Sequence, residues 1–189
     1  MISEWPGLVS GPAQALVEDS LVLLEHLGEA HRLVDVGSGG GLPGLPLKIA
    51  RPDLAITLIE ADQAKAAFLV QACARLELED VEVLARRAEE IGRDGRYRES
   101  FDVAVARAVA PLPVLVELCL PLVRVGGRLL AQKTDKEPIT PAERAIDFSI
   151  VVFGPSTSPP KPILSGVQIT LEPEWDAETK SCSTRAPVQ

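Results

Sequence analysis

A glycine-rich stretch after a short apolar run is the part of the chain best suited to bind a ligand. Residues 33–44 read LVDVGSGGGLPG. Glycine lets a ligand approach the backbone closely and adopts positive φ angles that other residues avoid. The spacing of Gly39, Gly41 and Gly44 matches the dinucleotide fingerprint. Gly37 adds a second reading, because Gly37-x-Gly39-x-Gly41 is the loop of S-adenosylmethionine (SAM) enzymes.

Two carboxylates beside this loop help to choose between the cofactors. Asp35 lies two residues before Gly37, where it would repel a pyrophosphate but attract the ammonium and sulfonium centres of SAM. Glu60 ends the next apolar strand and could accept both ribose hydroxyls of either cofactor. Asp35 therefore favours SAM, Glu60 supports a nucleoside without choosing between the two cofactors, and an NAD-dependent oxidoreductase stays open as the alternative.

Apolar periodicity predicts alternating strands and helices around the loop. We expect strands over 32–36, 55–60, 81–85, 101–106 and 128–132, and helices over 13–30, 42–50, 62–78 and 112–123. Asp62 is the expected N-cap of the third helix. Two further strands, 147–154 and 167–173, are expected to form a terminal antiparallel hairpin. The alternation indicates an α/β fold with right-handed βαβ units, which places the glycine loop at the carboxyl edge of a parallel sheet.

Length and composition set the wider frame. The 189 residues suit a helical segment over 1–31, one domain over 32–175 and a disordered tail over 176–189. A net charge of −8 argues against broad, non-specific nucleic-acid binding, although arginines gather between residues 86 and 107. The start of the chain lacks a signal core and no apolar run spans a bilayer, so we expect a cytoplasmic protein without membrane contact.

The three cysteines, Cys73, Cys119 and Cys182, match no zinc pattern, so no metal site is expected. Cys73 and Cys119 lie in apolar helical patterns, which predicts buried small side chains.

Several longer segments resemble one family, the bacterial small-subunit ribosomal RNA guanine-N7 methyltransferases, originally named glucose-inhibited division protein B. They are EDSLVLL (18–24), LVDVGSGGGLPGLPLKIARPDL (33–54), LIEADQAKAAFL (58–69), DVEVLARRAEE (80–90), FDVAVARAVAPLPVLVE (101–117) and LPLVRVGGRLLAQK (120–133). The resemblance covers about two thirds of the chain in order and spacing. It implies a Rossmann-like class I SAM-dependent methyltransferase with a mostly parallel seven-stranded sheet. It also implies transfer of a methyl group from SAM to N7 of a guanine in 16S ribosomal RNA or the small ribosomal subunit, by a monomer.

The resemblance also implies a set of cofactor-binding residues. They are Gly37, Ser38, Gly39, Leu42, Glu60, Ala88, Glu89 and Arg107. Main-chain groups of Ala88 and Glu89 would pair with the adenine, and Arg107 would orient the base or the cofactor carboxylate. Guanine N7 carries a free lone pair, so the reaction needs no general base, and we assign no catalytic residue. Lys65 and Lys133 match family lysines that could touch RNA phosphate.

Three departures from the family pattern keep other functions open. Leu16 stands where the family has a histidine, Ala66 and Ala67 stand where it tends to be basic, and no basic tail is recognisable after Lys133. All three fall on elements expected to face RNA or to pack. A SAM-dependent methyltransferase of a small molecule and a SAM-fold module without turnover therefore remain alternatives.

Overall fold

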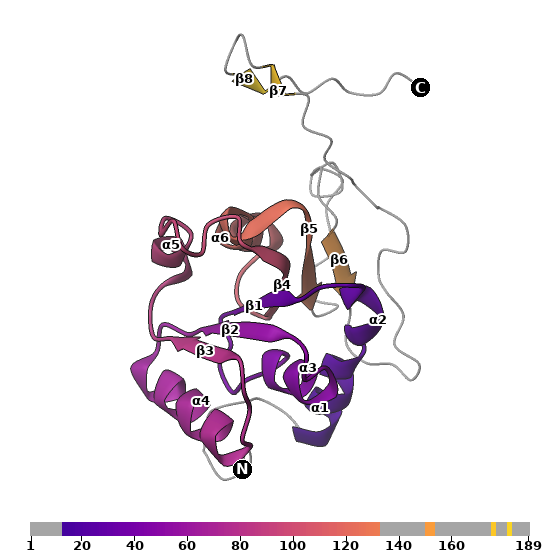
Figure 1. Ribbon diagram of the computed structural model, residues 1–189, viewed down its shortest axis with the longest axis vertical. Coiled ribbons are helices and arrows are strands. Elements are labelled where there is room, and N and C mark those ends of the chain that lie inside the picture. Colours follow the sequence, from indigo (N-terminus) through magenta and orange to yellow (C-terminus); the bar gives the residue numbers. More distant parts are fainter. Residues whose placement is uncertain (1–12, 133–149, 154–174, 177–180, 183–189) are drawn as a thin grey trace.

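The computed structural model describes residues 13–132, 150–153, 175–176 and 181–182, and its main sheet has six parallel strands in the order β3-β2-β1-β4-β5-β6 (Figure 1). The strands are β1 (Arg32–Val36), β2 (Ala55–Ile59), β3 (Val81–Leu84), β4 (Phe101–Arg107), β5 (Val123–Gln132) and β6 (Ile150–Phe153). The chain order reverses between β1 and β4. In a parallel α/β sheet such a reversal marks the place where ligands bind, at the carboxyl ends of the strands.

The number of strands differs from the expected seven. Five strands come from the continuous segment 13–132, and β6 extends the sheet by pairing in parallel with β5. The expected strand over 167–173 lies outside the described residues, so the proposed hairpin cannot be traced. Within the described part of the chain the main sheet therefore has six strands, all parallel. Two short strands, β7 (Trp175–Asp176) and β8 (Ser181–Cys182), pair with each other antiparallel.

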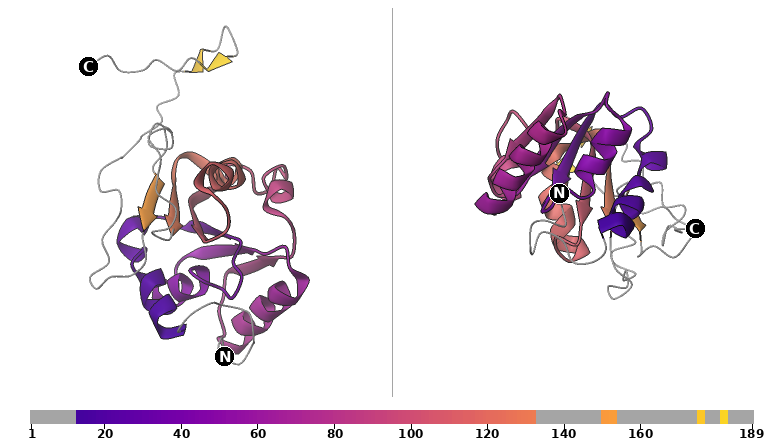
Figure 2. Two further views of the ribbon diagram at one scale, coloured as in Figure 1. Left: turned by 180° about the vertical axis from the view of Figure 1, so that it is seen from behind. Right: turned by 90° about the horizontal axis from the view of Figure 1, so that it is seen from below.

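Helices cover both faces of the sheet, and each face has its own aliphatic core. The helices are α1 (Ala13–Leu21), α2 (Leu24–Leu27), α3 (Gly44–Ala50), α4 (Gln63–Arg75), α5 (Ala88–Ile91) and α6 (Leu112–Cys119). Figures 1 and 2 show α1 to α4 on one side and α5 with α6 on the other. Phe68 and Leu69 of α4 pack in the first core, whereas Leu115 and Cys119 of α6 pack in the second.

Local chemistry sets where the helices begin and end. The Asp62 carboxylate accepts hydrogen bonds from the main-chain N–H groups of Ala64 and Lys65, which confirms it as the N-cap of α4. The helix expected over 112–123 ends at Cys119, because Pro121 allows only a 3-10 turn over Leu120–Leu122. The helix expected over 13–30 is two helices separated by a turn.

The β5 strand is longer than expected because a bulge takes up the Gly-Gly pair. The strand expected over 128–132 begins earlier, at Val123, and its register against β4 shifts between Phe101 and Val103. Gly126 has a φ of 79°, and a Cβ on Gly127 would lie 2.7 Å from the Asp102 carbonyl oxygen. The two glycines therefore let β5 bend without losing its partner strand.

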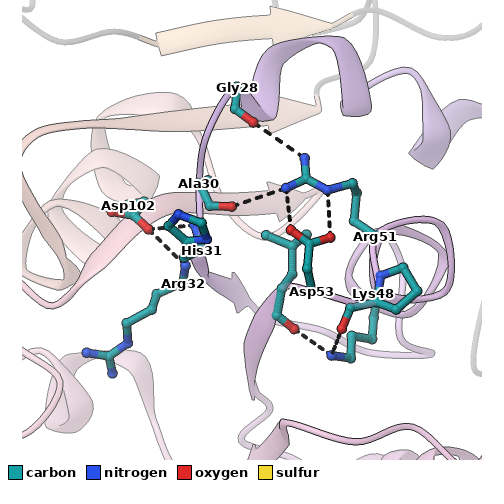
Figure 3. A network of polar contacts seen from close by, with 10 residues as sticks. Gly28, Ala30, His31, Arg32, Lys48, Arg51, Asp53 and Asp102 are labelled. Atoms are coloured by element: carbon teal, nitrogen blue, oxygen red, sulfur yellow. Dashed lines mark hydrogen bonds and ion pairs between the residues drawn. The ribbon is translucent and has the colours of Figure 1, made fainter.

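Polar contacts join the amino ends of the strands, at the edge of the sheet opposite the carboxyl ends where ligands bind (Figure 3). Asp102, at the start of β4, accepts hydrogen bonds from the main-chain N–H groups of His31 and Arg32, both at 2.8 Å, and from Arg124. Burial alone would raise the pKa of Asp102, but these hydrogen bonds outweigh it and lower the pKa to about 2. Asp102 therefore holds the first residue of β1 beside the start of β4.

We predict that Asp102→Asn destabilises the fold by about 1–3 kcal/mol at neutral pH, because charge-assisted hydrogen bonds are lost and an amide faces other donors. A carboxylate with a lowered pKa stabilises the folded state above its unfolded pKa, and that stability is lost as the pH falls through the folded value. The difference between wild type and variant should therefore shrink from about pH 4 to about pH 2. Urea unfolding across this range measures it, with exposed Glu79→Gln as the control; a pH-independent difference contradicts the prediction.

Candidate cofactor and acceptor site

The strand register lines up the candidate residues along the carboxyl edge of the sheet. Asp35 of β1 lies opposite Val105 of β4, so Gly37, directly after β1, and Arg107, the last residue of β4, leave the sheet side by side. Arg107 in turn pairs with Gln132, the last residue of β5. On the other side of β1, Glu60 follows the end of β2. The order across this edge is therefore Glu60, Gly37, Arg107, Gln132.

The glycine loop has the left-handed backbone that its sequence predicts, and each glycine meets a different constraint. Gly37, Gly39 and Gly41 have φ angles of 72°, 53° and 85°. A Cβ on Gly37 would collide with Val109, and a Cβ on Gly41 would collide with Leu45. A Cβ on Gly39 would meet nothing closer than the Gly37 carbonyl oxygen, at 3.9 Å. The space beside Gly39 is therefore open, and it is the place where a ligand can approach the loop.

The N–H groups of the loop are largely used within the protein. Gly37 and Ser38 donate to the Ile59 carbonyl, Gly39 to Glu60, Gly41 and Leu42 to the Ser38 carbonyl, and Gly44 to Asp35. A pyrophosphate site needs several free N–H groups pointing at the anion. Within 37–45 the hydrogen bonds leave no such row, so the geometry disfavours the dinucleotide alternative.

Asp35 acts differently from the role that the sequence suggested. It is fully buried, and its Oδ2 accepts a hydrogen bond of 2.9 Å from Gly44 N–H at the start of α3. Burial raises the pKa of Asp35 to about 7 against the opposing effect of the Gly44 hydrogen bond, and the charge of Glu60 adds to the rise. The side chain therefore mainly holds the start of α3, and at neutral pH it is only partly ionised. Its Oδ1 is buried without a partner.

Glu60 holds the outer side of the loop. One carboxylate oxygen accepts from Gly39 N–H and the other from Asp62 N–H, both at 2.8 Å. Each carboxylate oxygen keeps a second lone pair, so hydroxyl groups arriving beside Gly39 could still be bound. Glu60 is largely buried, at 9% exposed, and its contact with Gly39 places this capacity beside the open side of the loop.

The other predicted cofactor residues divide into two groups. Ser38 and Leu42 are buried in the loop, and the Ser38 hydroxyl donates to the Asp35 carbonyl at 2.9 Å. Ala88 is buried at the first turn of α5, beyond β3, and Glu89 beside it is exposed. The structure thus puts all of them along the same edge as Glu60. Lys65 is half-buried in α4, and Lys133 lies outside the described residues.

Arg107 contacts α1 and not the glycine loop. Its guanidinium forms an ion pair of 3.1 Å with Asp19 and donates to the Leu16 carbonyl at 3.2 Å. Gln132 donates from Nε2 to the Asp19 carbonyl at 2.8 Å, and its Oε1 is buried without a partner. Burial raises the pKa of Asp19, and the nearby Arg107 charge opposes the rise. Asp19 and Gln132 were not singled out from the sequence, although each is a polar residue ending or interrupting an apolar pattern.

Other chemistries find little support in the described part of the chain. Cys73 and Cys119 are buried as expected, and burial raises the pKa of both thiols. Among the residues described, no group of acids, histidines and cysteines could hold a metal ion. None of the described helices is long and apolar enough to cross a membrane.

The architecture and the position of the glycine loop define a class I SAM-dependent methyltransferase fold. The structure of Pyrococcus horikoshii TYW2 in complex with MeSAdo matches with a TM-score of 0.53 and 17% identity, over 65% of this chain and 44% of that one. Coclaurine N-methyltransferase bound to N-methylheliamine and SAH matches with a TM-score of 0.53 and 14% identity, over 64% and 35% of the two chains. At these identities the likeness concerns the fold alone.

The particular family follows from the sequence matches. The family model described as rRNA small subunit methyltransferase G matches residues 13–155, and the chain belongs to this family. A ribosomal RNA small subunit methyltransferase G from Roseiflexus castenholzii is 58% identical over 102 residues, which are 54% of this chain and 44% of the relative. One from Moorella thermoacetica is 48% identical over 136 residues, 70% and 57% of the two chains. The chain thus spans about half the length of these relatives.

We predict that Asp35→Asn makes the cofactor-free fold more stable at high pH. A buried acid with a raised pKa keeps its proton while the unfolded chain loses one, so wild-type stability falls between about pH 4 and about pH 7. Asparagine can still accept from Gly44 N–H and does not ionise. At pH 8 the variant should be more stable than wild type by roughly 2–4 kcal/mol, and at pH 4 the gain should vanish. Urea unfolding from pH 4 to 8 tests this, and a constant difference would count against it.

Proposed function

We propose that the chain is a SAM-dependent methyltransferase that methylates N7 of a guanine in 16S ribosomal RNA. Membership of the rRNA small subunit methyltransferase G family is the observation that carries the proposal. Three structural features also support it. They are the open space beside Gly39, the position of Glu60 and the order of residues along the carboxyl edge. Ribosomal RNA or the small subunit is then the partner, and the cytoplasm is the compartment where the protein meets it.

The residues of the edge fit SAM better than a dinucleotide. Glu60 would accept the ribose hydroxyls beside Gly39, and the backbone near Ala88 would meet the adenine on the β3 side. The methionine end would then point across Gly37 towards β4. The unpartnered Oδ1 of Asp35 is a buried hydrogen-bond acceptor beneath the loop, which suits a cofactor end with N–H donors better than an anion. The carboxylate that already occupies the Gly44 N–H disfavours a phosphate there.

The chain's own residues have mainly to position the reactants. SAM supplies an electrophilic methyl group, and guanine N7 supplies a lone pair that needs no deprotonation. The loop fixed by Glu60 and Asp35 holds the donor side rigid, and the Val109 segment after β4 lies directly against Gly37. An acceptor bound over β4 would therefore lie next to the methyl group, and proximity accounts for most of the rate.

A small-molecule acceptor is a second candidate, and the pairing of the arginines favours it. Asp94 accepts contacts from both Arg86 and Arg96, Arg98 pairs with Glu99, and Arg107 pairs with Asp19. These ion pairs reduce the positive charge that RNA phosphates would need. Tritiated SAM offered with small ribosomal subunits and with naked ribosomal RNA decides between the candidates. Labelled 7-methylguanine in the RNA supports the proposal, and labelling of neither substrate, despite SAM binding, contradicts it.

We predict that Glu60→Ala lowers SAM affinity by roughly 1–3 kcal/mol, because buried hydrogen bonds to the ribose are lost. Isothermal titration calorimetry measures the affinity, and thermal unfolding checks that the loop survives without the Glu60 bond to Gly39. Exposed Glu79→Ala is the matched control and should bind SAM as wild type does. An unchanged affinity in Glu60→Ala would remove Glu60 from the site.

Two glycine variants should separate binding from folding. Gly39→Ala places a methyl group in open space, so its cost to stability comes only from the φ of 53°, about 1–2 kcal/mol, and it should lower SAM affinity by about tenfold or more. Gly41→Ala has similar backbone strain at a φ of 85° and also drives its methyl group into Leu45, so it should destabilise the fold by roughly 2–5 kcal/mol. Calorimetry and urea unfolding on both variants give the two readouts. Equal losses of stability in the two would contradict the assignment of Gly39 to the ligand side.

A further inference from the structure

A polar cluster at the ends of β4 and β5, defined here as Asp19, Arg107 and Gln132, has a feature that packing alone does not explain. Gln132 is 4% exposed, and its amide orientation is set because Nε2 donates to the Asp19 carbonyl. Its Oε1 therefore points elsewhere and has no partner. A buried acceptor without a donor destabilises a fold by about 1–3 kcal/mol. Such an atom indicates a donor that arrives with a ligand.

The cluster offers a specific set of hydrogen-bonding groups. Gln132 Oε1 and the Asp19 carboxylate are acceptors, and the Arg107 guanidinium is a donor with N–H groups to spare beyond its two contacts. Guanine presents the complement on the edge away from N7: the N1–H and N2–H donors, with the O6 acceptor between N7 and N1. Adenine presents an acceptor at N1 and a donor at position 6, which is the reverse pattern.

We propose that this cluster reads the guanine of the acceptor, with Gln132 accepting from the N2 amino group, Asp19 from N1–H and Arg107 donating to O6. The proposal rests on the proposed function. The base would enter between α1 and the ends of β4 and β5, where the contacts of Arg107 and Gln132 with α1 would have to rearrange. None of the three residues reacts: they act on specificity, and the methyl group is transferred to N7, which lies beside O6 and away from N1 and N2.

The strand order supports this orientation. Gly37 directly follows β1, and Arg107 and Gln132 are the last residues of β4 and β5. These three strands are adjacent, and neighbouring strands lie about 4.8 Å apart in a sheet. Along guanine the corresponding order is N7, O6, then N1 with N2. A base that lies across β4 with its N7 towards the glycine loop therefore meets Arg107 at O6 and the two acceptors at its far end. The reverse orientation would place N7 at Gln132, away from the methyl group of SAM.

The test compares nucleotides that differ at single positions of this edge. Guanosine 5′-monophosphate (GMP), inosine 5′-monophosphate (IMP, without the N2 amino group) and adenosine 5′-monophosphate (AMP) are titrated at millimolar concentration into the full chain saturated with S-adenosylhomocysteine (SAH). Ligand-observed NMR gives the dissociation constants. We expect wild type to bind GMP about 5- to 10-fold more tightly than IMP, and AMP more weakly still.

Two variants and one control assign the preference to residues. Gln132→Met keeps the size of the side chain and should bring the GMP-to-IMP ratio close to one without changing SAH affinity. Asp19→Asn should weaken GMP and IMP alike, keep their ratio and reduce the preference over AMP. Gln71→Met, on the exposed side of α4, should behave as wild type. If circular dichroism shows that Gln132→Met does not fold, the inference is tested by Asp19→Asn instead. Its preference for GMP over AMP must then fall while its GMP-to-IMP ratio stays as in wild type.

The outcomes separate this inference from the proposed function. A chain that binds no SAH refutes the proposed function. Normal SAH binding with equal affinity of wild type for GMP and IMP, with no GMP binding, or with an unchanged ratio in Gln132→Met overturns the inference alone. A loss of SAH affinity in Gln132→Met also overturns it, because the cluster would then hold the methionine end of the cofactor.

Discussion

The hydrogen bond between the buried Asp35 carboxylate and Gly44 N–H organises the whole candidate site. It joins the end of β1 to the start of α3 over nine residues, so the glycine loop between them has little freedom. Gly44 must be glycine for this contact, since a Cβ would lie 2.6 Å from Asp35 Oδ2. The same bond occupies the helix start where a phosphate would bind in a dinucleotide enzyme. This one short contact therefore sets the shape of the loop and disfavours an anion at the start of α3.

Parallel register turns this local constraint into an ordered edge. Because β1, β4 and β5 pair without a break near their carboxyl ends, Gly37, Arg107 and Gln132 are held at neighbouring positions by the sheet itself. Glu60 is placed on the far side of the loop by the pairing of β2 with β1. The edge is thus divided at β1, with hydroxyl-binding capacity on one side and the polar cluster on the other. The Asp102 contacts hold the opposite ends of β1 and β4, which keeps the two strands in register along their length.

Sequence patterns predicted the elements well where chemistry is local and less well where it depends on distant partners. Strand positions, the Asp62 cap and the glycine conformations follow from apolar alternation and residue type, and the structure confirms them. The bulge at Gly126 could not be foreseen, because it depends on the register with β4. The contacts of Asp35 and Arg107 could not be foreseen for a similar reason, and the cofactor role expected for Arg107 stays a prediction. Sequence spacing shows that a charged residue lies near a loop. Only the packing shows that Asp35 is already bonded to Gly44 and Arg107 to Asp19.

The two sides of the edge also differ in how completely their polar groups are satisfied. On the donor side Glu60 and the loop N–H groups are already paired, so a cofactor adds bonds to a preformed frame. On the acceptor side Gln132 keeps an unpaired oxygen, and Arg107 and Asp19 are held by α1 and not by the sheet alone. In the proposed function this asymmetry is useful, because the small methyl donor would bind a rigid surface while the acceptor side would have to open for a base. The helix α1 therefore contributes to the acceptor side of the site, because it holds Arg107 and Gln132.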